Sequence, residues 1–413
     1  MKNDAYITKK CPVQFWDFVM IEDDLWYAAS GFNGLFRADL KSKISKFVGY
    51  FPGESNNAAD LYGGVCRWRD KLIFAPFVAN RIAAYDIVKN QFETYTIPAF
   101  ERNTKYPFPY FMGIVAVQDS IFFFGNIHPV IMQLNMITGE VKLHLKWYKD
   151  FEQCGKDPAT FLFDRHVLRR DAYLYATSRQ NNVMLKLNTK NCRVEFVEIG
   201  DRSARYSALA FGEDQFWVID QIHNELLCFS VNSQKTQKIV SLPGEAGNYD
   251  IAFCNGCLWI FSKRFSNTIS AYDMVYNPER NHLEILNLKQ MHDGYGVVFA
   301  KEEGEYVYCM YPDSNEIYKM HLVNDELIIH KLELEYSNAL YDTVYESGMI
   351  DGVFHEASSA KLCNTHTCIQ RNMNTFLKYV LYEEKAKYPQ YLGKQIGENI
   401  WGLTTGGIRS HGE

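Results

Sequence analysis

Apolar and polar residues follow one recurring pattern along most of the chain. A short apolar run meets a tight polar turn and a second apolar run follows. A polar loop then leads into a third run, which closes on Asp or Asn in most copies. Short runs bounded by turn residues predict β-strands rather than helices. The pattern recurs seven times between Phe18 and His321.

Each copy has an anchor residue in the loop before its third run. The anchors are Asn33, Asn80, Pro129, Asn182, Asn224, Asn267 and Asn315. Two positions later comes an aliphatic side chain: Leu35, Ile82, Ile131, Met184, Leu226, Ile269 or Ile317. The third run is predicted to end at Asp39, Asp86, Asn135, Asn188, Ser230, Asp273 or His321. The mean spacing of about 47 residues falls in the range of propeller blades.

The turns between the first two runs are short and polar, as β-hairpins require. Asn255-Gly256 is the strongest of them, because both residues tolerate a positive φ. A fourth strand is predicted after each third run, at residues 46–50, 93–97, 141–145, 194–199, 236–242, 282–286 and 326–332. Each unit is thus a four-stranded antiparallel meander, and seven units in a ring cover one another's apolar faces.

With this repeat the chain resembles a β-propeller from Phe15 to about Glu335. It is similar in repeat style to the quinoprotein-like, kelch-like and streptogramin-lyase-like propellers. Within the seven repeats the Gly pair of kelch blades occurs only at Gly63-Gly64, and no repeat closes on the Trp-Asp ending of another blade type. No family's catalytic residues are therefore carried over. The resemblance implies an all-β fold, a seven-bladed β-propeller of four-stranded antiparallel blades over residues 15–336, after a lead-in of residues 1–14.

The strand pattern stops after Tyr336, and residues 337–413 are predicted to form a small helical extension with a Gly-rich tail. Residues 365–388 place an apolar stripe at helical spacing: Ile369, Met373, Phe376, Leu377, Val380 and Leu381. This helix either packs on the propeller or docks a protein partner. The tail around Trp401 is either a frayed terminus or a peptide-like segment that enters a groove.

Composition narrows the function classes. With 43 Lys and Arg against 49 Asp and Glu, the net charge of -6 argues against a nucleic-acid partner held by bulk charge. No apolar run reaches the roughly 18 residues of a membrane span, and the N-terminal residues do not read as a signal peptide. The 10 cysteines are then expected to be mostly reduced thiols in a cytoplasmic protein.

Cofactor and metal motifs are weak. There is no phosphate-binding Gly loop and no GxSxG turn. Cys254 and Cys257 flank a hairpin turn, and the spacing of Cys363, His366 and Cys368 fits no standard zinc knuckle. We therefore expect no cofactor and no metal.

Loops that lead into strand one, and loops that join strands two and three, gather on one face of a propeller around its axis, by analogy with other propellers. On these loops we predict the ligand-binding residues Asp17, Tyr62, Phe111, Arg165, Tyr206, Tyr249, Asp250, Tyr295, Arg81, His128, Arg179, His223 and Arg264. Aromatic rings stack on ring-bearing ligands, and arginines pair with carboxylate or phosphate.

Two functions remain open from the sequence. The first is a module that binds a ring-bearing or anionic ligand, such as a small molecule, a glycan, a modified peptide or a partner segment. The second is an enzyme of the lyase, hydrolase or isomerase kind, in which an axial His works with Tyr or Asp in proton transfer. His166 and His292 are the candidates for that role, because both precede a first strand.

Overall fold

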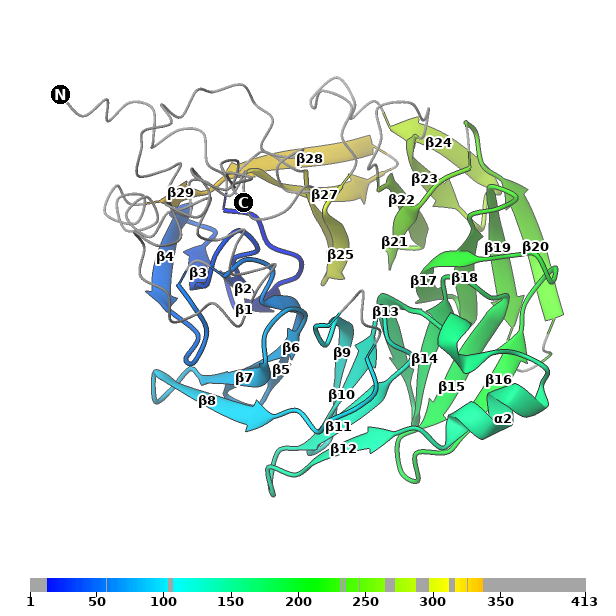
Figure 1. Cartoon of the computed structure of the whole chain (residues 1–413). Coiled ribbons are helices and arrows are strands. Elements are labelled where there is room, and N and C mark those ends of the chain that lie inside the picture. The colour runs from blue at the N-terminus through cyan, green and yellow to red at the C-terminus, as the bar shows by residue number, and fades with distance from the viewer. Residues whose placement is uncertain are drawn as a thin grey trace, which may run out of the picture. The chain divides into compact units, whose positions relative to one another are not determined.

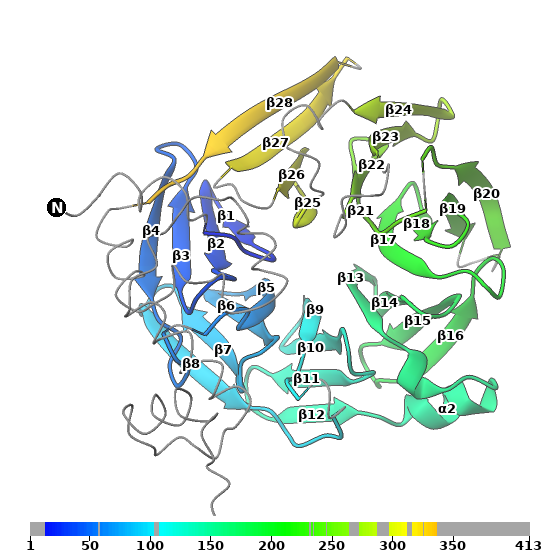
Figure 2. The same ribbon diagram turned by 45° about the horizontal axis from the view of Figure 1, so that its top comes forward.

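Seven sheets follow one another along the chain and stand as blades around a central axis (Figure 1, Figure 2). This computed structural model describes residues 13–56, 58–102, 107–230, 233, 235–244, 246–263, 272–286, 297–311, 316–324 and 326–336. They belong to a unit that spans Pro12–Ser337. The predicted C-terminal helix, the tail around Trp401 and the cysteines after residue 336 lie outside the described residues.

Every blade is a four-stranded antiparallel meander, so the chain forms a seven-bladed β-propeller. The strands of the first four blades, in chain order, are β1 (Val19–Ile21), β2 (Asp24–Ala28), β3 (Leu35–Asp39) and β4 (Ile44–Gly49); β5 (Tyr62–Trp68), β6 (Lys71–Pro76), β7 (Arg81–Asp86) and β8 (Gln91–Thr96); β9 (Phe111–Val117), β10 (Ser120–Gly125), β11 (Ile131–Asn135) and β12 (Val141–His144); β13 (Phe163–Arg170), β14 (Tyr173–Ser178), β15 (Val183–Asn188) and β16 (Val194–Glu198).

The last three blades repeat the same order. Their strands are β17 (Tyr206–Gly212), β18 (Gln215–Asp220), β19 (Glu225–Ser230) and β20 (Lys235–Ser241); β21 (Tyr249–Cys254), β22 (Cys257–Ser262), β23 (Asp273–Asn277) and β24 (His282–Leu286); β25 (Phe299–Glu303), β26 (Tyr306–Met310), β27 (Glu316–Val323) and β28 (Glu326–Glu333). The first strand of each blade lies nearest the axis and the fourth lies at the rim (Figure 2).

The hairpin turns predicted from the sequence are present. The first turn residue has a positive φ in most blades, for example Glu22 at 56°, Gln118 at 53° and Asn255 at 52°. Such a backbone suits the right-handed twist of two-residue hairpins. At Asn255 the turn sets the two thiols of Cys254 and Cys257 opposite each other across the hairpin, and both are free cysteines.

Two of the anchor asparagines, Asn33 and Asn224, connect the third strand to the end of the fourth. Asn33 is fully buried; its Nδ2 donates to the carbonyl of Phe51 at 3.0 Å, and its Oδ1 accepts from the Phe51 amide at 2.8 Å. Asn224 donates in the same way to the carbonyl of Leu242 at 2.9 Å. The anchor thereby satisfies backbone groups that would otherwise be buried without partners.

The alignment of the sixth and seventh copies was wrong at the third strand. Strand β23 begins at Asp273, where the sequence placed its end, and it ends at Asn277. The Asn277 side chain accepts from the Arg280 amide at 2.9 Å, so the turn after the third strand begins at Asn277 and not at Asp273. Asp273 instead accepts from the Ser262 amide at 2.9 Å. In the seventh blade, β27 continues past His321 because the turn falls at Asn324, whose φ is 51°.

Apolar clusters fill the spaces between neighbouring blades. Between blades one and two, for example, Trp26, Leu35, Phe51 and Phe74 pack together and are almost fully buried. Burying one such side chain stabilises the fold by about 1.5–3 kcal/mol. The strand pattern therefore predicts not only each sheet but also the contact that holds it to the next sheet.

The first and last blades meet through aromatic side chains. Phe18 lies 5.4 Å from Phe299 and 5.7 Å from Tyr308, between ring centroids. After β28 the chain adds a short strand, β29 (Glu335–Tyr336), which pairs in parallel with β4 at the rim of blade one. The ring thus closes both near its axis and at its rim.

One insertion departs from the blade pattern. Helix α2 (Trp147–Gln153) and the short helix η1 (Pro158–Thr160) lie between β12 and β13. Trp147 and Phe151 of α2 pack against Phe161 and Phe163 ahead of blade four. No helix in the described part of the chain has the length and apolar character to cross a membrane.

Candidate functional site

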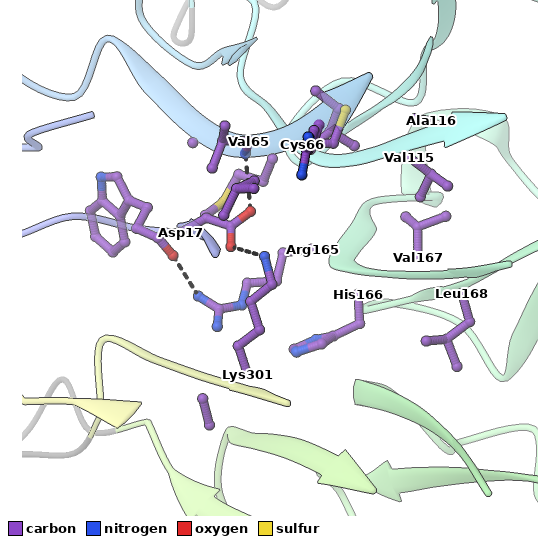
Figure 3. Close-up of a pocket in the computed structure, with 17 residues that line it drawn as sticks. Asp17, Val65, Cys66, Val115, Ala116, Arg165, His166, Val167, Leu168 and Lys301 are labelled. Carbon is purple, nitrogen blue, oxygen red and sulfur yellow. Dashed lines mark hydrogen bonds and ion pairs between the residues drawn. The ribbon is translucent and has the colours of Figure 1, made fainter. Parts of the chain in front are cut away.

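A pocket of about 420 Å³ lies among the first strands of the blades (Figure 3). Its walls come from β5, β9, β13 and β25 and from the segment around β1, so five of the blades contribute. A pocket of this size fits a small organic molecule. It occupies the axial position that the repeat predicts for a ligand.

The pocket has an apolar wall and a polar side. Val65, Val115 and Val167 are among its aliphatic residues, and Trp16 adds an indole ring. The Trp16 Nε1 donates to Asp60 at 2.8 Å, which fixes that ring. Such a wall can bury the apolar or ring-bearing body of a ligand.

The polar side is mostly cationic. Its charged or titratable side chains are Arg67, Arg165, His166, Lys301 and one acid, Asp17. The chain as a whole carries a net charge of -6. The pocket therefore has the opposite sign of charge from the protein around it, which favours an anionic ligand.

Behind the pocket lies a group of charged residues that we call the axial charge cluster: Asp164, Arg165, His166, Asp250 and Lys263. Asp250 is fully buried at its centre. Its carboxylate lies 2.5 Å from Arg165, 2.5 Å from His166 Nε2 and 3.3 Å from Lys263. It also accepts from the Ala300 amide at 2.9 Å. A buried carboxylate requires such partners, because an unpaired charge is expensive to bury.

The members of the cluster shift one another's pKa values. Burial alone would raise the pKa of Asp250, but Arg165, His166 and Lys263 hold it well below its usual range. Burial would lower the pKa of His166, but Asp250 and Asp164 outweigh burial and raise it. The raised pKa favours the protonated ring, and each ring nitrogen has a carboxylate beside it, Asp164 at 2.7 Å and Asp250 at 2.5 Å.

Arg165 connects four blades across the axis. One Nη atom reaches Asp250 of blade six, and the other donates to the carbonyl of Val298 at 3.1 Å and of Trp16 at 3.4 Å. Figure 3 shows Arg165 and Lys301 near Asp17. Because Arg165 belongs to β13, its guanidinium joins blade four to blades one, six and seven.

Asp17 also connects several blades. Its Oδ1 accepts from Lys301 at 2.8 Å, and its Oδ2 accepts from the Val65 amide of β5 at 3.0 Å. It thus ties blade one to blades two and seven. Asp17, Arg165 and His166 were all predicted to lie at the axis, and the structure brings them together at this pocket; Asp250 lies directly behind it.

The aromatic residues predicted as ligand contacts lie elsewhere. Tyr62, Phe111, Tyr206 and Tyr249 are buried in the cores between blades, with at most 3% of their surface exposed. None of them lines the pocket. The expectation that their rings face a ligand is wrong, because the start of a first strand turns its large apolar side chain toward the neighbouring blade. Tyr206, for example, packs against Leu209 and Leu227.

The remaining predicted residues are dispersed. His128 is buried and lies 2.9 Å from the carbonyl of Phe108 through Nε2. Arg179 donates to the carbonyl of Asn126 at 2.8 Å. Arg81 is exposed beside Thr94, and His223 pairs with Asp220 in blade five. Tyr295, Arg264 and His292 lie outside the described residues.

Several residues at the axis were missed as site residues. Asp164 and Lys263 complete the charge cluster, and Trp16 and Lys301 line the pocket. Lys301 follows Phe299 and Ala300 in a first strand and is itself followed by two glutamates, so nothing in the local sequence marks it as a site residue. No pattern in the sequence shows that its ammonium reaches Asp17, which is 284 positions away. In the part of the chain that the structure describes, no group of three His, Cys, Asp or Glu is placed to hold a metal ion.

Comparison with solved structures agrees with the fold. The chain is similar to virginiamycin B lyase from Staphylococcus aureus, at 16% identity and a TM-score of 0.57, covering 75% of this chain and 96% of that one. The chain is also similar to a catalytically inactive variant of that lyase with quinupristin, at 15% identity and a TM-score of 0.57, covering 78% of this chain and 97% of that one. Hsv2 of Kluyveromyces lactis is similar at 9% identity and a TM-score of 0.51, covering 78% of this chain and 99% of that one. At such identities the likeness concerns the fold alone. No family model and no curated protein matches the chain.

Proposed function

We propose that the propeller binds a small organic anion with an apolar or ring-bearing body in its axial pocket. The observation that carries the proposal is the composition of the pocket wall. Four cationic or titratable side chains and one acid stand opposite aliphatic residues and Trp16. The anionic group would lie toward Arg67 and Lys301, and the body of the ligand toward Val65 and Val167.

The cationic side can attract an anion without any loss of internal pairing. Arg165 and Lys301 keep their ion pairs with Asp250 and Asp17, so their charges are largely balanced and they offer a ligand hydrogen-bond donors rather than unpaired charge. Arg67 is exposed, and its Nε donates to the carbonyl of Arg69 at 2.8 Å. Since no carboxylate pair is recorded for it in the described region, Arg67 is the cation best suited to contact an anionic group.

A charge reversal at Arg67 tests this proposal. We expect Arg67→Glu to weaken binding of anilinonaphthalene sulfonate, a fluorescent aromatic anion, by about tenfold, because one favourable charge contact of about 1.4 kcal/mol is lost. Fluorescence titration of the full chain at low and moderate salt measures the dissociation constant. Copurified material released by denaturation, identified by mass spectrometry, gives the natural ligand class.

Arg69→Glu is the matched control. Arg69 is exposed, pairs with Asp119 at 2.9 Å and does not line the pocket. We expect that variant to bind the probe with an affinity within twofold of the wild type. Equal affinities for Arg67→Glu and the wild type, or a ligand bound at the blade rims, would contradict the proposal.

The second candidate is an enzyme, and the observation in its favour is His166 on the pocket wall. The direction of its pKa shift, upward because of Asp250 and Asp164, favours the role of a general acid. Both ring nitrogens are held by carboxylates, and His166 would have to leave one of them. The His166→Gln variant tests this candidate. If the protein turns over the copurified ligand, and the variant loses that turnover but still binds the probe, the result favours the enzyme.

A further inference from the structure

A serine, a histidine and an aspartate stand in hydrogen-bonded series in blade five, away from the pocket-lining residues. Ser203 precedes β17, Asp220 ends β18, and His223 lies between β18 and β19. The Ser203 Oγ lies 3.4 Å from His223 Nε2, and His223 Nδ1 lies 2.5 Å from Asp220 Oδ2. This order of atoms is that of a nucleophile, a general base and the acid that orients the base.

Asp220 is held in place by the backbone. It is 2% exposed, and its Oδ1 accepts from the Ile222 amide at 2.9 Å and the Arg205 amide at 3.2 Å. Its second oxygen is then directed at His223. A proton on Nδ1 shared with this carboxylate leaves Nε2 as the nitrogen that faces Ser203.

The site is accessible. The His223 side chain is 40% exposed, and Ser203 is an exposed residue. Ser203 Oγ also donates to Asp201 at 2.5 Å, so the hydroxyl is held beside the imidazole rather than free in solvent. Rotation of one side-chain torsion moves its proton from Asp201 to His223.

We propose that Ser203, His223 and Asp220 form a hydrolytic site for small carboxylic esters. Ser203 Oγ attacks the ester carbonyl as its proton passes to His223 Nε2, and the alcohol leaves with that proton. Water then cleaves the acyl-serine by the same route, so the products are the acid and the alcohol. The exposed Arg202 and Arg205 flank Ser203 in the sequence, which favours esters that carry a negative charge.

The test uses the full chain with nitrophenyl acetate, its anionic analogue nitrophenyl hemisuccinate, and a fluorophosphonate that labels activated serines. Mass spectrometry is expected to find the phosphonate on Ser203, and hemisuccinate is expected to react faster than acetate. Ser203→Ala and His223→Gln should each lower the hydrolysis rate by about a hundredfold, the usual contribution of a nucleophile or a general base.

The pH profile separates a base from a merely structural histidine. Asp220, Glu225 and Asp201 raise the pKa of His223, and the rate should therefore rise through a pKa above the ordinary histidine value. Ser42→Ala is the matched control, because Ser42 sits in a similar turn with Asp39 in blade one. Labelling that is unchanged in His223→Gln, or hydrolysis that persists in Ser203→Ala, would overturn the proposal.

Discussion

At the residue scale, two acids organise the centre of the ring, one just before a first strand and one at the beginning of another. Asp17 accepts the Val65 amide and Asp250 accepts the Ala300 amide, so each carboxylate fixes the first strand of the next blade. Each also pairs with a cation that faces the pocket, Lys301 or Arg165. The same residues therefore hold neighbouring blades together and set the sign of charge of the pocket.

Loss of the Asp250 charge should destabilise the fold strongly. Asp250→Asn keeps an acceptor for the Ala300 amide but leaves Arg165 and Lys263 without their shared carboxylate. Breaking a buried pair in this way costs about 3–5 kcal/mol. Denaturant unfolding of the variant and the wild type measures the difference.

Asp119→Asn provides the comparison. Asp119 is half-exposed and pairs with the exposed Arg69, so removing its charge should change the unfolding free energy by about 1 kcal/mol or less. If Asp250→Asn were no more destabilising than Asp119→Asn, the axial charge cluster would contribute nothing to stability.

The sequence was informative about charged residues at the axis and misleading about aromatic ones. Asp17 precedes a first strand as predicted, whereas Arg165 and His166 lie inside β13, in the stretch where its register shifts, and not before it. All three still line the axial pocket. Tyr206 and Tyr249 stand at the start of first strands, but alternate residues of a strand face opposite sides. The position of a residue in the repeat therefore does not show whether its side chain faces the pocket or the neighbouring blade.

At the element scale, a buried anchor asparagine joins the start of the third strand to the end of the fourth strand in its blade. Asn33→Ala should lower the unfolding free energy by about 2 kcal/mol, because the buried amide and carbonyl of Phe51 lose their partner. Asn80 occupies the same position in blade two but is exposed. Asn80→Ala should change stability by less than about 0.5 kcal/mol. Similar losses in both variants, measured by denaturant unfolding, would contradict the role of the buried anchor.

The fourth strands could be predicted to within a few residues, whereas the third strands of blades six and seven could not. Hairpin turns and fourth strands follow from local chemistry, as the positive φ of Gln118 and the predicted bounds of β24 show. In the sixth copy the anchor spacing predicted the end of the third strand at Asp273, where the strand in fact begins. The pairing of Asp273 with Leu286 and its contact with the Ser262 amide show this, and neither can be read from local chemistry.

At the scale of the whole molecule, the ring depends on the contact between its first and last blades. Phe15 and Phe18 precede β1, and both pack on Phe299 of β25. The Glu335 amide donates to the carbonyl of Lys43 at 2.9 Å, where β29 joins β4. These contacts join residues about 300 positions apart, so they close the longest loop in the propeller and are costly in chain entropy.

Truncation of a side chain in this contact should therefore destabilise both the first and the last blade. Phe18→Ala removes a fully buried ring and should cost about 3–5 kcal/mol. Hydrogen exchange should become faster in β1 and β2 and equally in β25 and β26, because each pair of strands loses its cover. Phe124→Ala, a deletion of the same size between blades three and four, should instead speed exchange in β10 and β13. Exchange that rises only in blade one of Phe18→Ala, while β25 stays protected, would mean that blade seven is held by its other neighbour alone.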